Sequence, residues 1–153
     1  MSRLYILIRN DIPSLNPGKA IAQASHAVSQ FMTKFPEEAK EWCEEADGFG
    51  TTIVMEGNKD NITHFIKSHG KKVPSGDIID PTYPFYLQKE IIPFLAKNAE
   101  IEYGEPSDNN YDTTPATRKE HTCSWFLIEN DDNEEYMEDL KYYFDVYKLK
   151  LFR

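Results

Sequence analysis

The sequence predicts an α/β protein: a single layered domain, residues 1–153, in which a small, mixed, roughly four-stranded sheet carries helices on both faces. Short apolar or β-branched runs alternate with longer segments of helical periodicity, as in layered α/β folds. A chain of 153 residues is long enough for one domain with a buried core. Hydrophobic residues at 40% and aromatic residues at 13% fit a globular protein and exclude a disordered one.

The first half of the chain alternates strands with helices. Pro17 suits the first turn of a helix, where its missing N–H is no loss, and Pro36 ends that helix. Polar residues and Gly70 mark the borders of a later helix. The predicted elements are a strand at 4–9, a loop at 10–16, a helix at 17–35, an acidic helix at 37–46, a strand at 51–56 and a helix from Asn58 or Asp60 to about Ser68.

The second half has weaker patterns. TCSWFLIE at 122–129 predicts the last long strand, and Met137, Leu140, Phe144 and Tyr147 recur at helical spacing. Between the halves we expect an insertion at 83–119, made of helix and loop. The expected elements are a weak strand at 72–79, a helix at 83–98 kinked by Pro93 and an exposed loop at 105–118.

The composition excludes several classes of protein. Cys43 and Cys123 match no metal-ligand spacing, so we expect reduced thiols and neither a metal nor another cofactor. The N-terminal apolar run is too short for a signal peptide, and no segment approaches a membrane span. We therefore expect a cytoplasmic protein that does not contact a membrane.

The charge of the chain bears on its partners. Lys and Arg number 17 against 26 acidic residues, for a net charge of −9, which is unusual for a general nucleic-acid binder. The acidic residues cluster at 37–47, 100–112 and 129–139, whereas Arg9, Lys19, Lys71 and Lys72 lie outside those clusters. A small basic site on an acidic body is compatible with this distribution.

The stretch GKAIAQASHA at 18–27 opens the first predicted helix. At 100° per residue, Lys19, Gln23, His26 and Gln30 fall within about 60° of one another and form a polar stripe. The opposite side is expected to be the core face, and it consists of Ile21, Ala24, Val28, Phe31, Met32 and Phe35.

Lys19 lies at a helix N-terminus, where the helix dipole disfavours positive charge by a few tenths of a kcal/mol. A carboxylate, a phosphate or an oxyanion nearby would offset this penalty. The segment is not a phosphate-binding P-loop, since Ala20 replaces the required Ser or Thr. The alternative is a merely solvated polar stripe, with His26 hydrogen-bonded to a neighbouring loop.

GKAIAQASHA resembles the signature helix of the second, archaeal and eukaryotic type of peptidyl-tRNA hydrolase, G-K-x-x-A-Q-x-x-H-A. The preceding LYILIRNDI, with Arg9, Asn10 and Asp11, is similar to the first strand of that family and its R-x-D-L segment. TTIVMEG resembles its second strand, and YKLKLF resembles its terminus. The departures lie in the catalytic loop, where D-A-G-x-T is replaced by Asp80-Pro81-Thr82, and in the insertion that follows it.

The resemblance implies hydrolysis of the ester between a peptide and the terminal ribose of tRNA, without metal or covalent intermediate. It implies that Lys19 supplies positive charge to the oxyanion or terminal phosphate, and that Asp80 orients Lys19 or the attacking water. Gln23 and a hydroxyl from Thr82 or Ser124 would position water or ribose. The expected binding or supporting residues are Arg9, Asn10, Asp11, Gly18, His26, Lys71 and Lys72.

Two functions remain open from the sequence. The first is the hydrolase, acting on the acceptor end of tRNA or a similar acyl-RNA. The second is a catalytically silent binding module of the same fold that holds an RNA end, a nucleotide or a protein partner. Asp80 has its own alternative as a turn residue before proline. We also expect that the chain can form a homodimer and that the insertion can contact a protein partner.

Overall fold

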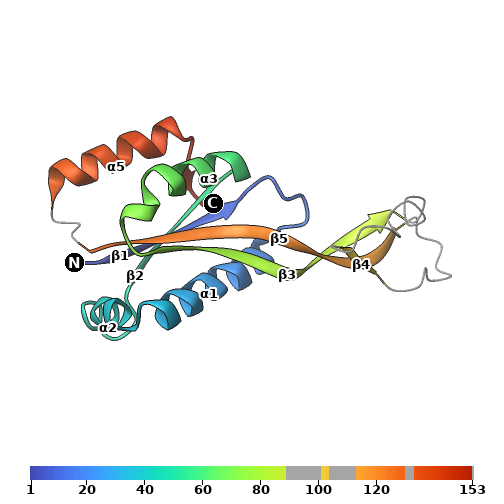
Figure 1. Ribbon diagram of the computed structural model, residues 1–153, viewed down its shortest axis with the longest axis horizontal. Coiled ribbons are helices and arrows are strands. Elements are labelled where there is room, and N and C mark those ends of the chain that lie inside the picture. Colours follow the sequence, from blue (N-terminus) through green and yellow to red (C-terminus); the bar gives the residue numbers. More distant parts are fainter. Residues whose placement is uncertain (89–100, 104–112, 130–132, 153) are drawn as a thin grey trace. The chain divides into compact units, whose positions relative to one another are not determined.

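The computed structural model describes residues 1–88, 101–103, 113–129 and 133–152. These residues form two compact units (Figure 1). The first unit comprises residues 1–78 and 122–153, and the second comprises residues 79–121. The expected organisation, a single domain with an insertion at 83–119, stays a prediction.

The elements of the first unit follow the predicted order of strands and helices. They are β1 (Arg3–Arg9), α1 (Pro17–Lys34), α2 (Pro36–Glu44), β2 (Thr51–Gly57), α3 (Lys59–Ser68), the 3₁₀ turn η1 (Gly70–Lys72), α5 (Glu134–Val146) and β6 (Lys150–Leu151). Two long strands, β3 (Ser75–Gln88) and β5 (Thr113–Ile128), begin in one unit and end in the other.

The sheet is mixed, as the sequence predicted. The strand order is β3-β5-β1-β2-β6, and β4 (Ile101–Tyr103) pairs with β5 beside this path. β1 runs parallel to β2 and antiparallel to β5, and β2 runs antiparallel to β6. The described sheet therefore has six strands, because β4 and the short β6 join the roughly four that were expected.

One face of the sheet is covered by α1 and α2 (Figure 1). In the register of β1 with β5, Ile6 lies opposite Trp125 and Ile8 opposite Cys123, and all four side chains are buried on this face. The indole of Trp42 on α2 donates a hydrogen bond to the carbonyl of Thr51 at 2.7 Å. This bond fixes α2 against the start of β2.

The other face is covered by α3 and α5 and is dominated by aromatic rings (Figure 1). Tyr5 stacks on its cross-strand neighbour Phe126, with ring centroids 5.0 Å apart and planes within 4°. Phe65 of α3 and Phe144 of α5 pack against Phe126 at centroid distances of 5.3 and 6.4 Å. Such ring packing contributes stability beyond the burial of apolar area.

The orientation of α1 differs from the prediction. The buried residues of this helix are Ala20, Gln23, Ala27 and Phe31, whereas Ile21 is 69% exposed and Met32 is 47% exposed. The expected core face was thus wrong at Ile21 and Met32. The reason is that β5 offers hydrogen-bonding partners to the glutamines of α1, so the helix turns part of its polar stripe towards the sheet.

The second unit is a β structure in its described residues. Ile101 lies opposite Arg118 and Tyr103 opposite Ala116 in the antiparallel pairing of β4 with β5. A small cluster contains Leu87, Ala116 and Phe85, and the Arg118 guanidinium lies 4.8 Å from the centre of the Phe85 ring. Among the described residues of this unit, the buried apolar cluster is therefore small.

Two predictions about this unit were wrong. Residues 83–88 belong to β3 and not to a helix, because their burial alternates, with Tyr83 and Leu87 buried and Tyr86 exposed. Pro84 is tolerated because β3 is an edge strand. Residues 113–118 belong to β5 and not to a loop, with Thr114 and Ala116 buried. The rest of the predicted helix and loop lies largely outside the described residues.

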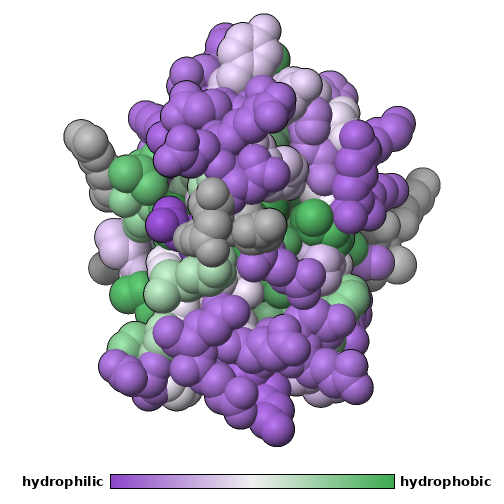
Figure 2. Space-filling model, turned by 90° about the vertical axis from the view of Figure 1, so that its left-hand side faces the viewer, coloured by the Kyte–Doolittle hydropathy of each residue, from purple (hydrophilic) through white to green (hydrophobic). Residues whose placement is uncertain are grey.

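Figure 2 shows the face of the molecule at the left of Figure 1. Hydrophilic side chains gather over α5 at its top and over α2 at its bottom, with hydrophobic atoms between them. Both helices carry acidic residues in their first turns, which are Glu37 and Glu38 in α2 and Glu134 and Glu135 in α5. Much of the net negative charge of the first unit therefore lies on α2 and α5, away from the first turn of α1.

Candidate functional site at the head of α1

The first turn of α1 is fixed by its N-cap. Asn16 has extended backbone dihedrals, and its side-chain oxygen accepts the backbone N–H of Lys19 at 2.9 Å. Pro17 occupies the first helical position, as predicted, and Gly18 is exposed beside it. Because the first turn contains no acidic residue, the Lys19 side chain, which is partly buried, meets the positive end of the helix dipole. This arrangement favours an anion.

The residues after β1 connect the strand to the start of α3. Arg9 is 8% exposed and binds Asp11 in a two-point contact, with Nε to Oδ1 at 2.8 Å and Nη2 to Oδ2 at 3.2 Å. The carboxylate of Asp11 also accepts the backbone N–H of Lys59 at 3.4 Å. Asn10 donates its backbone N–H to the carbonyl of Gly57 at 2.9 Å. Arg9, Asn10 and Asp11 therefore shape the loop that leads to Lys19.

Asp11 has a shifted acidity for identifiable reasons. Burial by itself would raise the pKa of Asp11, but the hydrogen bond from Arg9, the N–H of Lys59 and the charge of Arg9 lower it on balance. Asp11 is therefore ionised at neutral pH and neutralises Arg9. The Arg9 guanidinium is thus paired within the protein.

Gln23 is the most deeply buried residue of the predicted polar stripe, at 4% exposure. The hydroxyl of Thr122 donates to Gln23 Oε1 at 2.7 Å, and Thr122 is itself fully buried. The thiol of Cys123 contacts the backbone carbonyl of Gln23 at 3.6 Å. A buried amide held in this way has a fixed orientation, because breaking the bond would leave two polar groups without partners.

Gln30, two turns further along α1, makes a second bridge to the sheet. Its Oε1 accepts the indole N–H of Trp125 at 2.8 Å, and its amide donates to the carbonyl of Asp77 at 3.2 Å. A Cβ atom on Gly76 would collide with Gln30 Oε1 and the Trp125 ring, so the close approach of β3 requires glycine there. The polar stripe is thus largely a set of helix-to-sheet contacts.

Ser124 lies on the opposite face of the sheet from α1. It pairs across the ladder with Leu7, which belongs to the aromatic face, and its hydroxyl donates to Asp77 Oδ1 at 2.6 Å. The structure therefore does not bring Ser124 together with Gln23, and Thr122 is the hydroxyl that contacts this amide. The catalytic role of Ser124 stays a prediction.

The remaining predicted site residues are more dispersed. His26 is exposed on α1, and Lys71 and Lys72 are exposed on η1. Asp80 and Thr82 belong to the second unit, where Asp80 Oδ1 accepts the backbone N–H of Thr82 at 2.9 Å. This local bond is the one expected of an aspartate that shapes the chain at a proline, and the catalytic roles of both residues stay predictions.

Two contact residues were missed from the sequence, Thr122 and Asp77. Asp77 belongs to β3 and Thr122 belongs to β5, and the sequence predicted a strand in each of these regions. Strand alternation assigns Thr122 and Ser124 to the same face of the sheet. Thr122 nevertheless contacts Gln23 of α1, so this contact could not be predicted from alternation.

Among the described residues, no group of three or more His, Cys, Asp and Glu side chains is placed to hold a metal ion. Within the same residues, no helix combines the length and the apolar character needed to cross a bilayer. Cys43 and Cys123 form no disulfide.

The site joins a mixed sheet to a helix that carries Lys19 in its first turn and the buried Gln23 amide one turn later. Helix N-termini are a class of site at which proteins bind anions. The comparison with protein families makes this class specific. Residues 2–76 match the model of the peptidyl-tRNA hydrolase PTH2 family. The resemblance stated from GKAIAQASHA is thereby confirmed.

The matched range contains Arg9, Gly18, Lys19, Gln23 and His26. It ends before Asp80, Thr82 and Ser124, so the family match gives these three residues no support. No curated protein matches the chain.

Proposed function

We propose that the protein hydrolyses the ester bond of peptidyl-tRNA, or of a related N-blocked aminoacyl-tRNA, and releases the peptide and the tRNA. The single observation that carries this proposal is the position of Lys19. It lies in the first turn of α1, inside the segment that matches the PTH2 family. Because the substrate belongs to translation, the proposal also places the protein in the cytoplasm.

The proposed chemistry begins with attack of water on the ester carbonyl. The carbonyl oxygen becomes an oxyanion in the tetrahedral intermediate, and Lys19 together with the positive end of the α1 dipole supplies the potential that stabilises it. Collapse of the intermediate breaks the bond to the ribose oxygen, which takes up the proton that the attacking water released and leaves with the tRNA.

The role proposed for Gln23 is to orient water or ribose. Its Oε1 is occupied by the Thr122 hydroxyl, so its amide N–H groups point in a direction that this bond determines. We accordingly assign Thr122 as a positioning residue that acts through Gln23. Asp80 remains the carboxylate proposed to orient Lys19 or the attacking water, and Thr82 and Ser124 remain the proposed hydroxyl groups.

The charge distribution fits a substrate with one phosphate-rich end. Lys19, in the first turn of α1, and Lys71, on η1, lie outside the acidic helices α2 and α5. Binding would therefore be confined to the acceptor end of tRNA. Few counterions would be released from the RNA, so the affinity should depend only weakly on salt concentration. A homodimer, and a protein partner for the segment 83–119, are further proposals that the sequence suggested.

The test is release of N-acetylated aminoacyl groups from tRNA by the full chain, comparing wild type, Lys19→Ala and Lys34→Ala. Lys34 is a matched control because it is an exposed lysine in the last turn of the same helix. We expect Lys19→Ala to lower kcat at least about a hundredfold, as loss of an oxyanion donor does, and Lys34→Ala to leave it unchanged.

Two outcomes would overturn the proposal. One is no release by folded wild-type protein at high concentration. The other is an equal loss in both variants, since this would indicate a general effect of charge on RNA binding and not a group at the reacting ester.

A further inference from the structure

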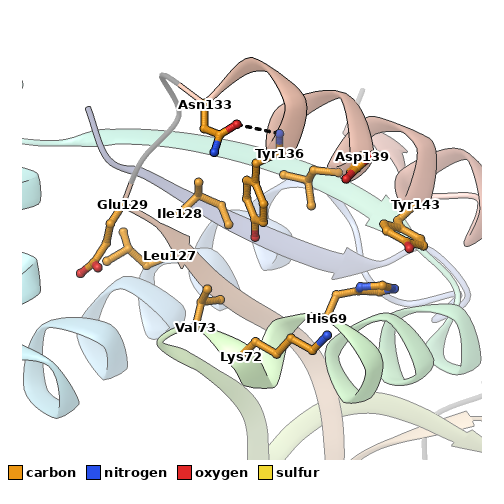
Figure 3. A pocket seen from close by; sticks show the side chains of 11 residues that line it. His69, Lys72, Val73, Leu127, Ile128, Glu129, Asn133, Tyr136, Asp139 and Tyr143 are labelled. Carbon is orange, nitrogen blue, oxygen red and sulfur yellow. Dashed lines mark hydrogen bonds between the residues drawn. The ribbon is translucent and has the colours of Figure 1, made fainter.

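A cavity of about 520 Å³ lies between η1, the end of β5 and α5 (Figure 3). It is on the side of the sheet opposite α1, so it is separate from the candidate site at Lys19. Its volume falls in the range of small-molecule sites, about 300–1,000 Å³. Val73, Ile128 and Leu140 supply an apolar lining. The proposed hydrolysis uses none of these three residues.

The walls of the cavity carry opposite charges. Figure 3 shows Lys72 on the η1 side and Asp139 on the α5 side. Within the described residues, neither side chain forms a hydrogen bond or an ion pair. Two complementary charges that face one cavity without pairing leave a place for a ligand that satisfies both.

Aromatic side chains line the space between these charges. Tyr136 and Tyr143 project from α5, and the Tyr143 ring lies against the His69 ring with centroids 3.9 Å apart. Asn133 caps α5 by accepting the Tyr136 N–H at 3.0 Å, which fixes the turn that carries Tyr136. These rings offer flat apolar surface with a hydroxyl at the edge.

The histidine and the tyrosine of the lining that have shifted pKa values are uncharged at neutral pH. Burial and the neighbouring Lys72 charge lower the pKa of His69, so its imidazole is neutral at pH 7. Burial raises the pKa of Tyr136, so its hydroxyl stays protonated. Lys72 is thus the cationic lining group, and the lining also includes the carboxylates of Asp139 and Glu129.

We propose that this cavity binds a zwitterionic ligand of the amino-acid class that carries a large apolar side chain. The ligand carboxylate would meet Lys72, its ammonium group would meet Asp139, and its side chain would lie against Tyr136 and Tyr143. A polyphosphate fits poorly because the lining holds two carboxylates against one ammonium group. A plain hydrocarbon would pair with neither charge.

The first experiment uses calorimetric titration of the full chain with three probes of similar shape. These are L-phenylalanine, phenylacetate, which lacks the carbon that bears the ammonium group, and phenethylamine, which lacks the carboxylate. We expect L-phenylalanine to bind about tenfold more tightly than either analogue, because each analogue leaves one charged wall without a partner.

Matched variants then assign the two charges. Lys72→Met should weaken L-phenylalanine about tenfold while sparing phenethylamine, and Lys71→Met is its control, because Lys71 is an exposed neighbour outside the lining. Asp139→Asn should weaken L-phenylalanine while sparing phenylacetate, with Asp145→Asn of the same helix as its control.

The inference is overturned if folded wild-type protein binds L-phenylalanine no better than both analogues, or not at all at millimolar concentration. It is also overturned if Lys71→Met weakens binding as much as Lys72→Met does. All of these measurements are of binding and not of ester hydrolysis, so they do not depend on the proposed function.

Discussion

The two faces of the sheet are built from the same strands but differ in the side chains that they bury. On the α3/α5 face, the rings of Tyr5, Phe65, Phe126 and Phe144 pack together in an aromatic core. On the α1 face, Gln23 and Gln30 are inserted among apolar side chains and hydrogen-bonded to β5.

The difference separates stability from positioning. Buried aromatic area stabilises without requiring particular hydrogen bonds, whereas a buried amide contributes little net free energy and becomes costly if its partner is lost. On the α1 face, the hydrogen bond from Thr122 holds the Gln23 amide in one orientation, one turn after Lys19. We therefore expect substitutions on the two faces to act on different observables.

The largest effect on stability should come from Phe126→Ala. Removal of this fully buried ring from the aromatic face should lower the free energy of unfolding by about 3–5 kcal/mol. Urea denaturation measures it, with Tyr142→Ala, at a position 64% exposed, as a control expected within about 0.5 kcal/mol. Hydrolysis per folded molecule should not change. A loss below about 1 kcal/mol would contradict this account of the aromatic face.

Thr122→Val should have a smaller effect on stability but a distinct one on activity. Loss of the hydroxyl leaves Gln23 Oε1 buried without its partner, at a cost of about 1–3 kcal/mol. Because Gln23 is then free to turn, we also expect kcat to fall about tenfold at unchanged KM. Thr52→Val, at an exposed strand position, is the control.

A double-mutant cycle sharpens this prediction. Once Gln23→Ala has been made, Thr122→Val should cost little further activity, because Thr122 acts through Gln23. Additive losses would show that Thr122 does not position the amide.

Cys123 tests whether the α1 face excludes water despite its polar groups. Burial raises the pKa of the Cys123 thiol from 9.0 to about 12. At pH 8, iodoacetamide should therefore modify the partly exposed Cys43 in the native protein and reach Cys123 only on unfolding. Rapid labelling of both thiols would contradict a dry α1 face.

The same shift predicts a dependence of stability on pH. A thiol whose folded pKa is raised binds its proton more tightly in the folded state, so its contribution is full below about pH 9 and is lost as the pH rises towards 12. Cys123→Ala should remove this part of the alkaline loss of stability. Cys43→Ala should leave it in place.

The smallest effect is expected at Ile21, and it checks the orientation of α1. Since Ile21 is 69% exposed, Ile21→Lys should change the free energy of unfolding by no more than about 0.5 kcal/mol. Ala27→Lys should be severe, because Ala27 is fully buried between α1 and the sheet. If Ile21→Lys destabilised the protein more than Ala27→Lys, the core face predicted from hydrophobic periodicity would be the correct one.

The sequence by itself determined the order of elements in the first unit. Pro17 and Pro36 bracket α1, Asn58 caps α3 and the β-branched run at 51–57 forms β2, because these signals act within a few residues of one another. The same locality explains why GKAIAQASHA identified the family, since the family's helix signature lies in ten consecutive residues.

Tertiary structure decided the direction in which α1 faces and the partners of its polar side chains. Hydrophobic periodicity assigns every apolar residue to the core, but hydrogen bonds from Thr122 and Trp125 bury glutamine and leave Ile21 in solvent. It also decided that residues 83–88 and 113–118 are strands, because pairing along β3 and β5 overrides a weak local helix or turn pattern. Contacts between residues about 100 positions apart cannot be read from either segment alone.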